Sequence, residues 1–172
     1  MISPRSHPLV ELARRAISEY LDARQVIGVP ASFHEAFPNP SGVFVCLKKN
    51  GQLRGCVGTY EPTQPSVAAE VIQNAIASAT KDPRFIPLTA TELGDIDCSV
   101  DVLSRPMPAM SRDWDPRQFG VLVVRGSKRG LLLPDLDGIR TAEEQIRMAK
   151  EKAGIFADEE AALYRFDVQR YR

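Results

Sequence analysis

Histidine and cysteine, the usual ligands of structural zinc, are scarce in this chain, which has only two histidines and three cysteines in 172 residues. It contains neither a Cys-x-x-Cys nor a His-x-x-x-His spacing, the patterns typical of zinc sites. The nucleophile-elbow, P-loop and dinucleotide-binding glycine motifs are absent as well. We therefore expect no metal and no cofactor.

Net charge and long apolar runs are also lacking. The 22 basic and 22 acidic residues cancel to +0, whereas nucleic-acid binders usually carry a basic surplus. No apolar run approaches the roughly 18–20 residues that a membrane span needs, and the start, MISPRSHPLVELARR, lacks the apolar centre of a signal peptide. An odd number of irregularly spaced cysteines does not indicate a disulfide scaffold. We therefore expect a cytoplasmic protein that binds neither nucleic acid nor membranes.

What the chain does contain is enough apolar material for a core, since hydrophobic residues make up 44% of it. Its length fits a single domain over residues 1–172, with room for two sub-lobes of which one is smaller.

Two segments have the apolar spacing of amphipathic helices, namely residues 8–24 and 64–80, and a third helix is predicted over 141–153. The third begins with a Thr-x-x-Glu capping box, and Gly154 is its natural C-cap. The segment 25–42 has three prolines and little periodicity, which predicts a connecting loop.

Strand patterns lie between these helices, and the first two flank an Asn-Gly turn, the strongest short hairpin signal. The expected strands are 43–49, 52–59, 95–104, 119–125, 129–133 and a last edge strand over 163–172. Because the strands come as hairpins with helices between them, the pattern predicts an α+β fold with a mainly antiparallel sheet and helices packed on it.

The two-residue turn of the first hairpin predicts its register. Leu47 should face Arg54, and Cys46 should face Gly55. In that register Cys46 and Cys56 point to opposite faces, so we expect no disulfide between them. Arg54 and Cys56 project from one face, about 7 Å apart at a rise of about 3.3 Å per residue.

This arrangement supports two interpretations. In the functional one, Arg54 lowers the pKa of a reactive Cys56 thiol, and Gly55 and Gly58 leave room for a ligand beside the backbone. In the structural one, a small cysteine is buried, the arginine pairs with a carboxylate, and the glycines mark a bulge.

The other candidates are weaker. Cys98 and Cys46 continue apolar strand patterns, which predicts two core residues. His34 lies in the proline-rich segment, where a surface role competes with that of a general base. The basic turn 125–130 fits either a phosphate site or a solvated turn.

The heptad LRGCVGT at residues 53–59 closely resembles the signature of the AMMECR domain family. Further pieces follow in the family's order: GVFVCLKKNGQ (42–52), ATKDPRFIPLTATEL (79–93), CSVDVLSRP (98–106) and RGLLLPDLDGIRTAEEQIRMAKEKAGI (129–155). The chain departs from the family at Asp135–Gly138, where members often continue with Gln-Val-Ala and a tryptophan.

The resemblance implies an α+β fold with a curved antiparallel sheet and no known metal site. It also implies partners, because family members occur beside or fused to Memo-type and radical SAM proteins. It implies no established activity. The residues that it marks as a site are Arg54, Gly55, Cys56, Gly58, Thr59, Asp82, Arg84 and Phe85.

Two function hypotheses follow. In the first, the protein is a thiol enzyme or enzyme component: Cys56 is the nucleophile, Arg54 holds a small anionic substrate, and Asp82 or His34 handles the proton. In the second, the same face is a non-catalytic binding or adaptor module for a small anion or for Memo-type and radical SAM proteins. Replacing Cys56 by serine should abolish the first activity and spare the second, whereas Arg54→Ala should abolish binding by an adaptor.

Overall fold

A computed structural model describes residues 6–109, 112 and 114–172 of the chain, which form two compact units. Unit 1 runs up to Val102 and includes Gln169–Arg172 from the chain end, and unit 2 comprises Leu103–Val168. Over the described residues, no helix has the length and apolar character needed to cross a membrane.

The helices of unit 1 are α1 (Pro8–Ala23), α2 (Ser32–Ala36), α3 (Val67–Thr80) and the 3₁₀ helix η1 (Ala90–Asp95). The first and third confirm the helices predicted from apolar spacing. The second lies in the segment predicted to be a loop, and it escaped prediction because five residues are too few to show a helical period.

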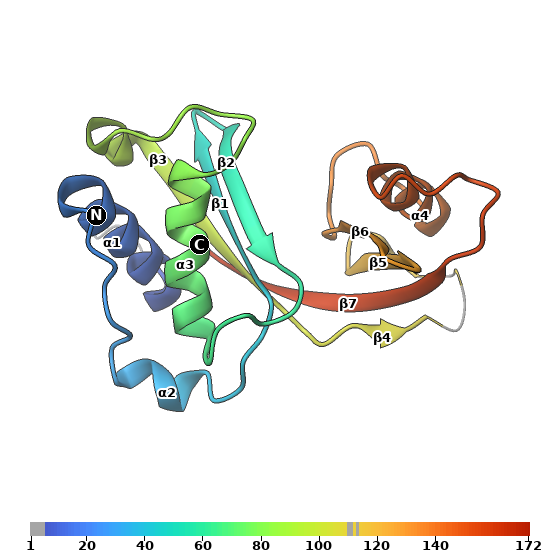
Figure 1. The fold of residues 1–172 in the computed structure, drawn as a ribbon, viewed down its shortest axis with the longest axis horizontal. Helices are drawn as coiled ribbons and strands as arrows, with labels where there is room; N and C mark the ends of the chain where they lie inside the picture. Colours follow the sequence, from blue (N-terminus) through green and yellow to red (C-terminus); the bar gives the residue numbers. More distant parts are fainter. Residues whose placement is uncertain (1–5, 110–111, 113) are drawn as a thin grey trace, which may run out of the picture. The chain divides into compact units, whose positions relative to one another are not determined.

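The sheet of unit 1 has β1 (Val43–Lys49) between β2 (Gln52–Thr59) and β3 (Ile96–Leu103), all antiparallel. Figure 1 shows α1 and α3 on one side of these strands. Alternate residues of β1 are fully buried in the core shared with these helices, namely Val43, Val45 and Leu47. The remaining residues of β1 therefore face away from the helices.

The last strand β7 (Ala162–Tyr171) belongs to unit 2 up to Val168. It pairs there with β4 (Met107–Pro108) and β5 (Phe119–Arg125), and β5 pairs with β6 (Lys128–Leu132). The helix α4 (Ala142–Lys152) packs on β5 and β6. The prediction of an edge strand at the chain end is therefore wrong. It failed because β7 lies between β3 and β5 in the strand order, and the pairing of strands distant in sequence leaves no local pattern.

Local turn and cap signals are confirmed. Asn50 and Gly51 have φ values of 51° and 78°, the left-handed pair that the two-residue hairpin requires. Thr141 and Glu144 form the reciprocal capping box of α4. Gly154, with φ at 66°, follows the end of that helix in the left-handed conformation.

The register of the first hairpin differs from the predicted one because β2 contains a bulge. Leu47 lies opposite Gly55, and Arg54 is the extra residue without a counterpart on β1. Past the bulge, Cys46 lies opposite Cys56. The prediction that these cysteines point to opposite faces is therefore wrong, since one inserted residue shifts the alternation of every residue beyond it.

Candidate functional site

A stripe of buried polar side chains runs along the face of α3 that meets the first hairpin. Its members recur every four residues, one above another on the helix surface, and the last lies just past the helix end: Glu70, Asn74, Ser78 and Asp82. Each is at most 5% exposed. Buried polar groups require hydrogen-bond partners, and the backbone of the hairpin and the side chains beside it supply them.

Ser78 connects the two strands of the hairpin. Its hydroxyl donates to the carbonyl of Val45 at 2.8 Å and accepts from the amide of Val57 at 2.9 Å. One turn earlier, the Asn74 amide donates to the carbonyl of Val43 at 2.9 Å. The helix therefore fixes the positions of β1 and β2 through their backbones.

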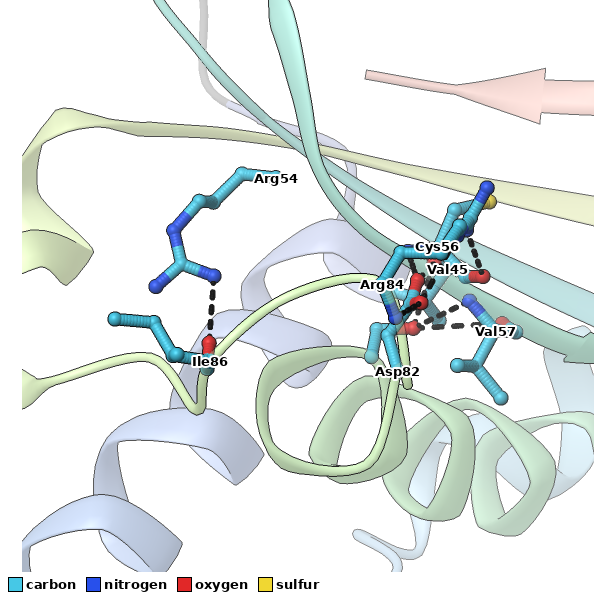
Figure 2. Close-up of polar contacts among 8 residues, drawn as sticks. Val45, Arg54, Cys56, Val57, Asp82, Arg84 and Ile86 are labelled. Carbon is cyan, nitrogen blue, oxygen red and sulfur yellow. Dashed lines mark hydrogen bonds and ion pairs between the residues drawn. The ribbon is translucent and has the colours of Figure 1, made fainter.

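Asp82 and Arg84 hold the backbone of Cys56 from the outer side of β2 (Figure 2). The Asp82 carboxylate accepts from the Cys56 amide at 2.9 Å, and Arg84 Nη2 donates to the Cys56 carbonyl at 3.2 Å. The guanidinium also binds the carboxylate through Nε at 2.9 Å and Nη2 at 2.7 Å. These contacts hold the pKa of the Asp82 carboxyl well below its ordinary value.

The glycines of the heptad lie where no side chain fits. A Cβ at Gly55 would overlap the carbonyl of Ser78, and a Cβ at Gly58 would overlap the ring of Phe44. The space beside both glycines is thus filled by the protein itself.

Arg54 is bound by groups of its own chain. Its Nε and Nη2 donate to the Glu92 carboxylate at 3.3 and 3.2 Å, and its Nη1 donates to the carbonyl of Ile86 at 2.9 Å. This pairing lowers the pKa of Glu92 to about 2. Figure 2 shows Arg54 directed at Ile86, away from the cluster around Cys56. The arginine in contact with Cys56 is Arg84. The sequence had predicted Arg54 to be the cation beside this cysteine.

The side chains of Cys46 and Cys56 meet on the sheet face opposite the helices, and we call them the thiol pair. A hydrogen bond between the thiols lowers the pKa of Cys46 to about 7, and the same bond together with burial raises the pKa of Cys56. Cys46 is half-buried and is not part of the helix-packed core, although the sequence predicted a core residue there. Cys98 packs against the core as predicted, and burial raises its pKa to about 12.

Charged groups surround the thiol pair. Lys48 and Arg170 lower the pKa of the Cys46 thiol, and Asp101 raises it. Arg84 lowers that of Cys56. Arg170 is held by two 2.8 Å hydrogen bonds to the Asp101 carboxylate, whereas Lys48 is exposed and the side chain of Arg84 is 54% exposed. The accessible charges beside the pair are thus positive.

The other residues marked by the sequence have structural contacts. The Thr59 hydroxyl donates to Glu70 at 2.6 Å, and the guanidinium of Arg84 lies 5.5 Å from the ring centre of Phe85. His34 lies on α2, and the structure gives it no hydrogen bond or ion pair with the thiol pair. The roles assigned to these residues in ligand binding stay predictions.

Sequence reasoning missed Cys46 as a partner of Cys56 because it extended the register of the two-residue turn without interruption, whereas Arg54 is an extra residue on β2. It also missed the polar stripe of α3, although a signal was present. Polar residues recur at positions 70, 74 and 78, at four-residue intervals, in a helix that is mostly apolar. Such spacing predicts a polar contact along one face of a buried helix.

The model of the AMMECR1 family matches residues 10–171 of the chain. A protein of Thermotoga maritima is 49% identical over 170 residues, which cover 96% of this chain and 98% of that protein. A longer protein of Clostridium acetobutylicum is 44% identical over 167 residues, which cover 96% of this chain and 36% of that protein.

Among solved structures, the crystal structure of an uncharacterized protein from Pyrococcus horikoshii is similar, with a TM-score of 0.86 and 33% sequence identity. The match covers 94% of this chain and 88% of that one. The likeness confirms the predicted α+β fold with its curved, mainly antiparallel sheet.

Proposed function

This chain belongs to the AMMECR1 family, and we propose that it is a thiol-dependent enzyme, or a component of one, that acts on a small anionic substrate. The observation that carries the proposal is the thiol pair. Two free cysteines lie opposite each other on adjacent strands, outside the helix-packed core and beside exposed cations. A thiol with a hydrogen-bond donor and cations nearby reacts as its thiolate at neutral pH.

The structure supports a different division of roles from the one that the sequence suggested. Cys46 has the lower pKa and acts as the nucleophile, and Cys56 donates the hydrogen bond that stabilises its thiolate. Arg84 and Lys48 attract the anionic group of the substrate, because the guanidinium of Arg54 is already paired. The thiolate electron pair forms the bond to the substrate. The leaving group departs with the electron pair of the broken bond and takes its proton from Cys56.

The test is the alkylation rate of each thiol against pH, in protein with Cys98 replaced by alanine. Cys46 should react with an apparent pKa near 7, below the value of about 8.5 for a free cysteine. Adding Cys56→Ala should raise that apparent pKa, because the hydrogen bond is lost. Slow alkylation of both thiols would show that the pair is structural. So would an apparent pKa of Cys46 that is the same with and without Cys56→Ala.

An adaptor function is the second candidate, and the observation that favours it is Ile86. This side chain is 80% exposed, while its carbonyl is held by Arg54. An apolar side chain fixed in solvent is suited to contact a partner protein, and the family resemblance names Memo-type and radical SAM proteins as the partners to test. In this function Ile86→Asp abolishes binding and Cys46→Ser does not. The enzyme function requires that Cys46→Ser abolish activity without loss of partner binding.

A further inference from the structure

We propose that Cys46 and Cys56 are a redox-active pair, which a small-molecule disulfide converts into an intramolecular disulfide between adjacent strands. The inference concerns the same thiols as the proposed function, but it rests on backbone geometry and does not require that the chain be an enzyme. It also reverses the expectation from sequence that these two cysteines cannot be joined.

The direction of the Cys56 backbone determines how closely the two cysteine side chains approach. Its amide and its carbonyl are both taken by side chains outside the hairpin, those of Asp82 and Arg84. In an antiparallel ladder, the amide and the carbonyl of one residue point to the same side. Both groups of Cys56 therefore point away from β1, and its pair with Cys46 is of the non-hydrogen-bonded kind.

The next pair along the ladder agrees with this assignment. The amide of Val57 and the carbonyl of Val45 point at each other and are joined through the Ser78 hydroxyl. Hydrogen-bonded and non-hydrogen-bonded pairs alternate along antiparallel strands. A hydrogen-bonded pair at Val45 and Val57 therefore places a non-hydrogen-bonded pair at the two cysteines.

Pairs of this kind bring side chains closest together. Their Cα atoms are about 4.5 Å apart, within the range of about 4.4–6.8 Å found across disulfides. Cys46 and Cys56 are direct register partners, so their side chains leave neighbouring points of the same sheet face. The bond between the sulfurs can thus form with little movement of either strand, each of which is fixed to α3 by the polar stripe.

The chemistry is a thiol–disulfide exchange in two steps. The Cys46 thiolate attacks one sulfur of the small-molecule disulfide, forms a mixed disulfide and releases one thiolate. Cys56 then loses its proton, attacks the Cys46 sulfur and releases the second thiolate. The protein loses two electrons and two protons, and the oxidant gains them as two thiols.

The groups around the pair suit the first step. Lys48 and Arg170 favour the Cys46 thiolate, Asp101 opposes it, and Arg84 acts on the side of Cys56. An anionic disulfide such as oxidised glutathione would meet the exposed charges of Arg84 and Lys48. Oxidation consumes both thiols, so the disulfide form has no nucleophile and the proposed activity is switched off.

The experiment uses the full chain with Cys98→Ala, equilibrated with graded ratios of reduced and oxidised glutathione at pH 7.5 and quenched in acid. We expect both remaining thiols to disappear together, with a product lighter by two hydrogens and a cross-linked peptide containing Cys46 and Cys56. Adding Cys56→Ala should leave a stable glutathione adduct on Cys46. Adding Cys46→Ala should abolish the cross-linked peptide and the loss of two hydrogens, because Cys56 then has no partner thiol on β1.

A lasting glutathione adduct in the two-thiol protein, or no oxidation at any ratio, would overturn the inference. Its failure is distinguishable from that of the proposed function, since alkylation is measured on the fully reduced protein. Rapid alkylation of Cys46 without formation of a disulfide would support the enzyme proposal and contradict the redox pair. Formation of the disulfide without a lowered apparent pKa of Cys46 would support the redox pair and contradict the enzyme proposal.

Discussion

At the scale of single residues, one backbone carbonyl of α3 explains why position 55 is a glycine. A side chain at this position would overlap the carbonyl of Ser78, and neither the helix nor the hairpin can move away freely because hydrogen bonds join them. We therefore expect Gly55→Ala to lower the free energy of unfolding by about 1–3 kcal/mol, as overpacking does. Urea unfolding measures the change. Gly94→Ala is the matched control, since an added Cβ there meets nothing within 4 Å. Equal stability of the two variants would contradict the close approach.

At the scale of secondary-structure elements, α3 and the hairpin are joined by the polar stripe as well as by apolar contact. Ser78→Ala removes the donor of one backbone carbonyl and the acceptor of one amide. We expect it to cost about 1–3 kcal/mol, the penalty for leaving buried groups unsatisfied. The control is Ser18→Ala on α1, whose hydroxyl makes an exposed hydrogen bond to Asp22. Since both changes gain the same helix propensity, a difference between them measures the buried bonds, and no difference would contradict their role.

The same elements show how far the sequence predicts this fold. Apolar spacing, the Asn-Gly turn and the Thr141 capping box are local signals, and each predicted its element correctly. The bulge at Arg54 is a tertiary effect. Arg54 leaves the ladder to reach Glu92, which is 38 residues away in the chain. No local pattern carries that information, and the register error followed from it.

The candidate site was predicted only in part from the sequence. Cys56 and its strand were identified, because a heptad with glycines and an arginine is unusual in a strand that only fills a core. Cys46 was assigned to the core, and the charge beside Cys56 was assigned to Arg54 in place of Arg84. Both errors have one cause, since the position of each residue beyond the bulge depends on the register. A site built across two strands is therefore only as predictable as their pairing.

At the scale of the whole molecule, the ion pair of Arg54 and Glu92 makes stability depend on pH. The folded-state pKa of Glu92 is about 2, below its ordinary value of 4.5. A lowered pKa contributes stability that is complete above about pH 4.5 and is lost as the pH falls towards 2. Glu92→Gln should therefore lower the free energy of unfolding at pH 7 by about 1.5–3 kcal/mol, and the difference from the unchanged protein should shrink between pH 4.5 and pH 2.

Urea titrations at a series of pH values measure this difference. The control is Glu61→Gln, which alters an exposed carboxylate and should leave the pH profile unchanged. A Glu92→Gln deficit that stays constant from pH 7 to pH 2 would show that the carboxylate acts through packing and not through its charge.

Deleting the last four residues, 169–172, tests whether residues 1–172 fold as one domain. They belong to unit 1, although the 66 residues of unit 2 precede them directly. Their contacts in unit 1 include the stacking of Tyr171 on His7, with ring centres 4.0 Å apart, and the pair of Arg170 with Asp101, whose side chain is 4% exposed. Deleting residues 169–172 leaves that carboxylate buried without this arginine, so we expect a loss of about 3 kcal/mol or more.

Two probes then separate the units. Trp114 is the only tryptophan and lies in unit 2, whereas α1 and α3, with 16 and 14 residues, belong to unit 1. Tryptophan fluorescence therefore follows unit 2, and circular dichroism follows mostly unit 1. If the chain is one cooperative domain, the deletion shifts both unfolding curves to the same lower urea concentration. If the fluorescence curve stays in place while the dichroism curve shifts, the units unfold independently and the prediction of a single domain is wrong.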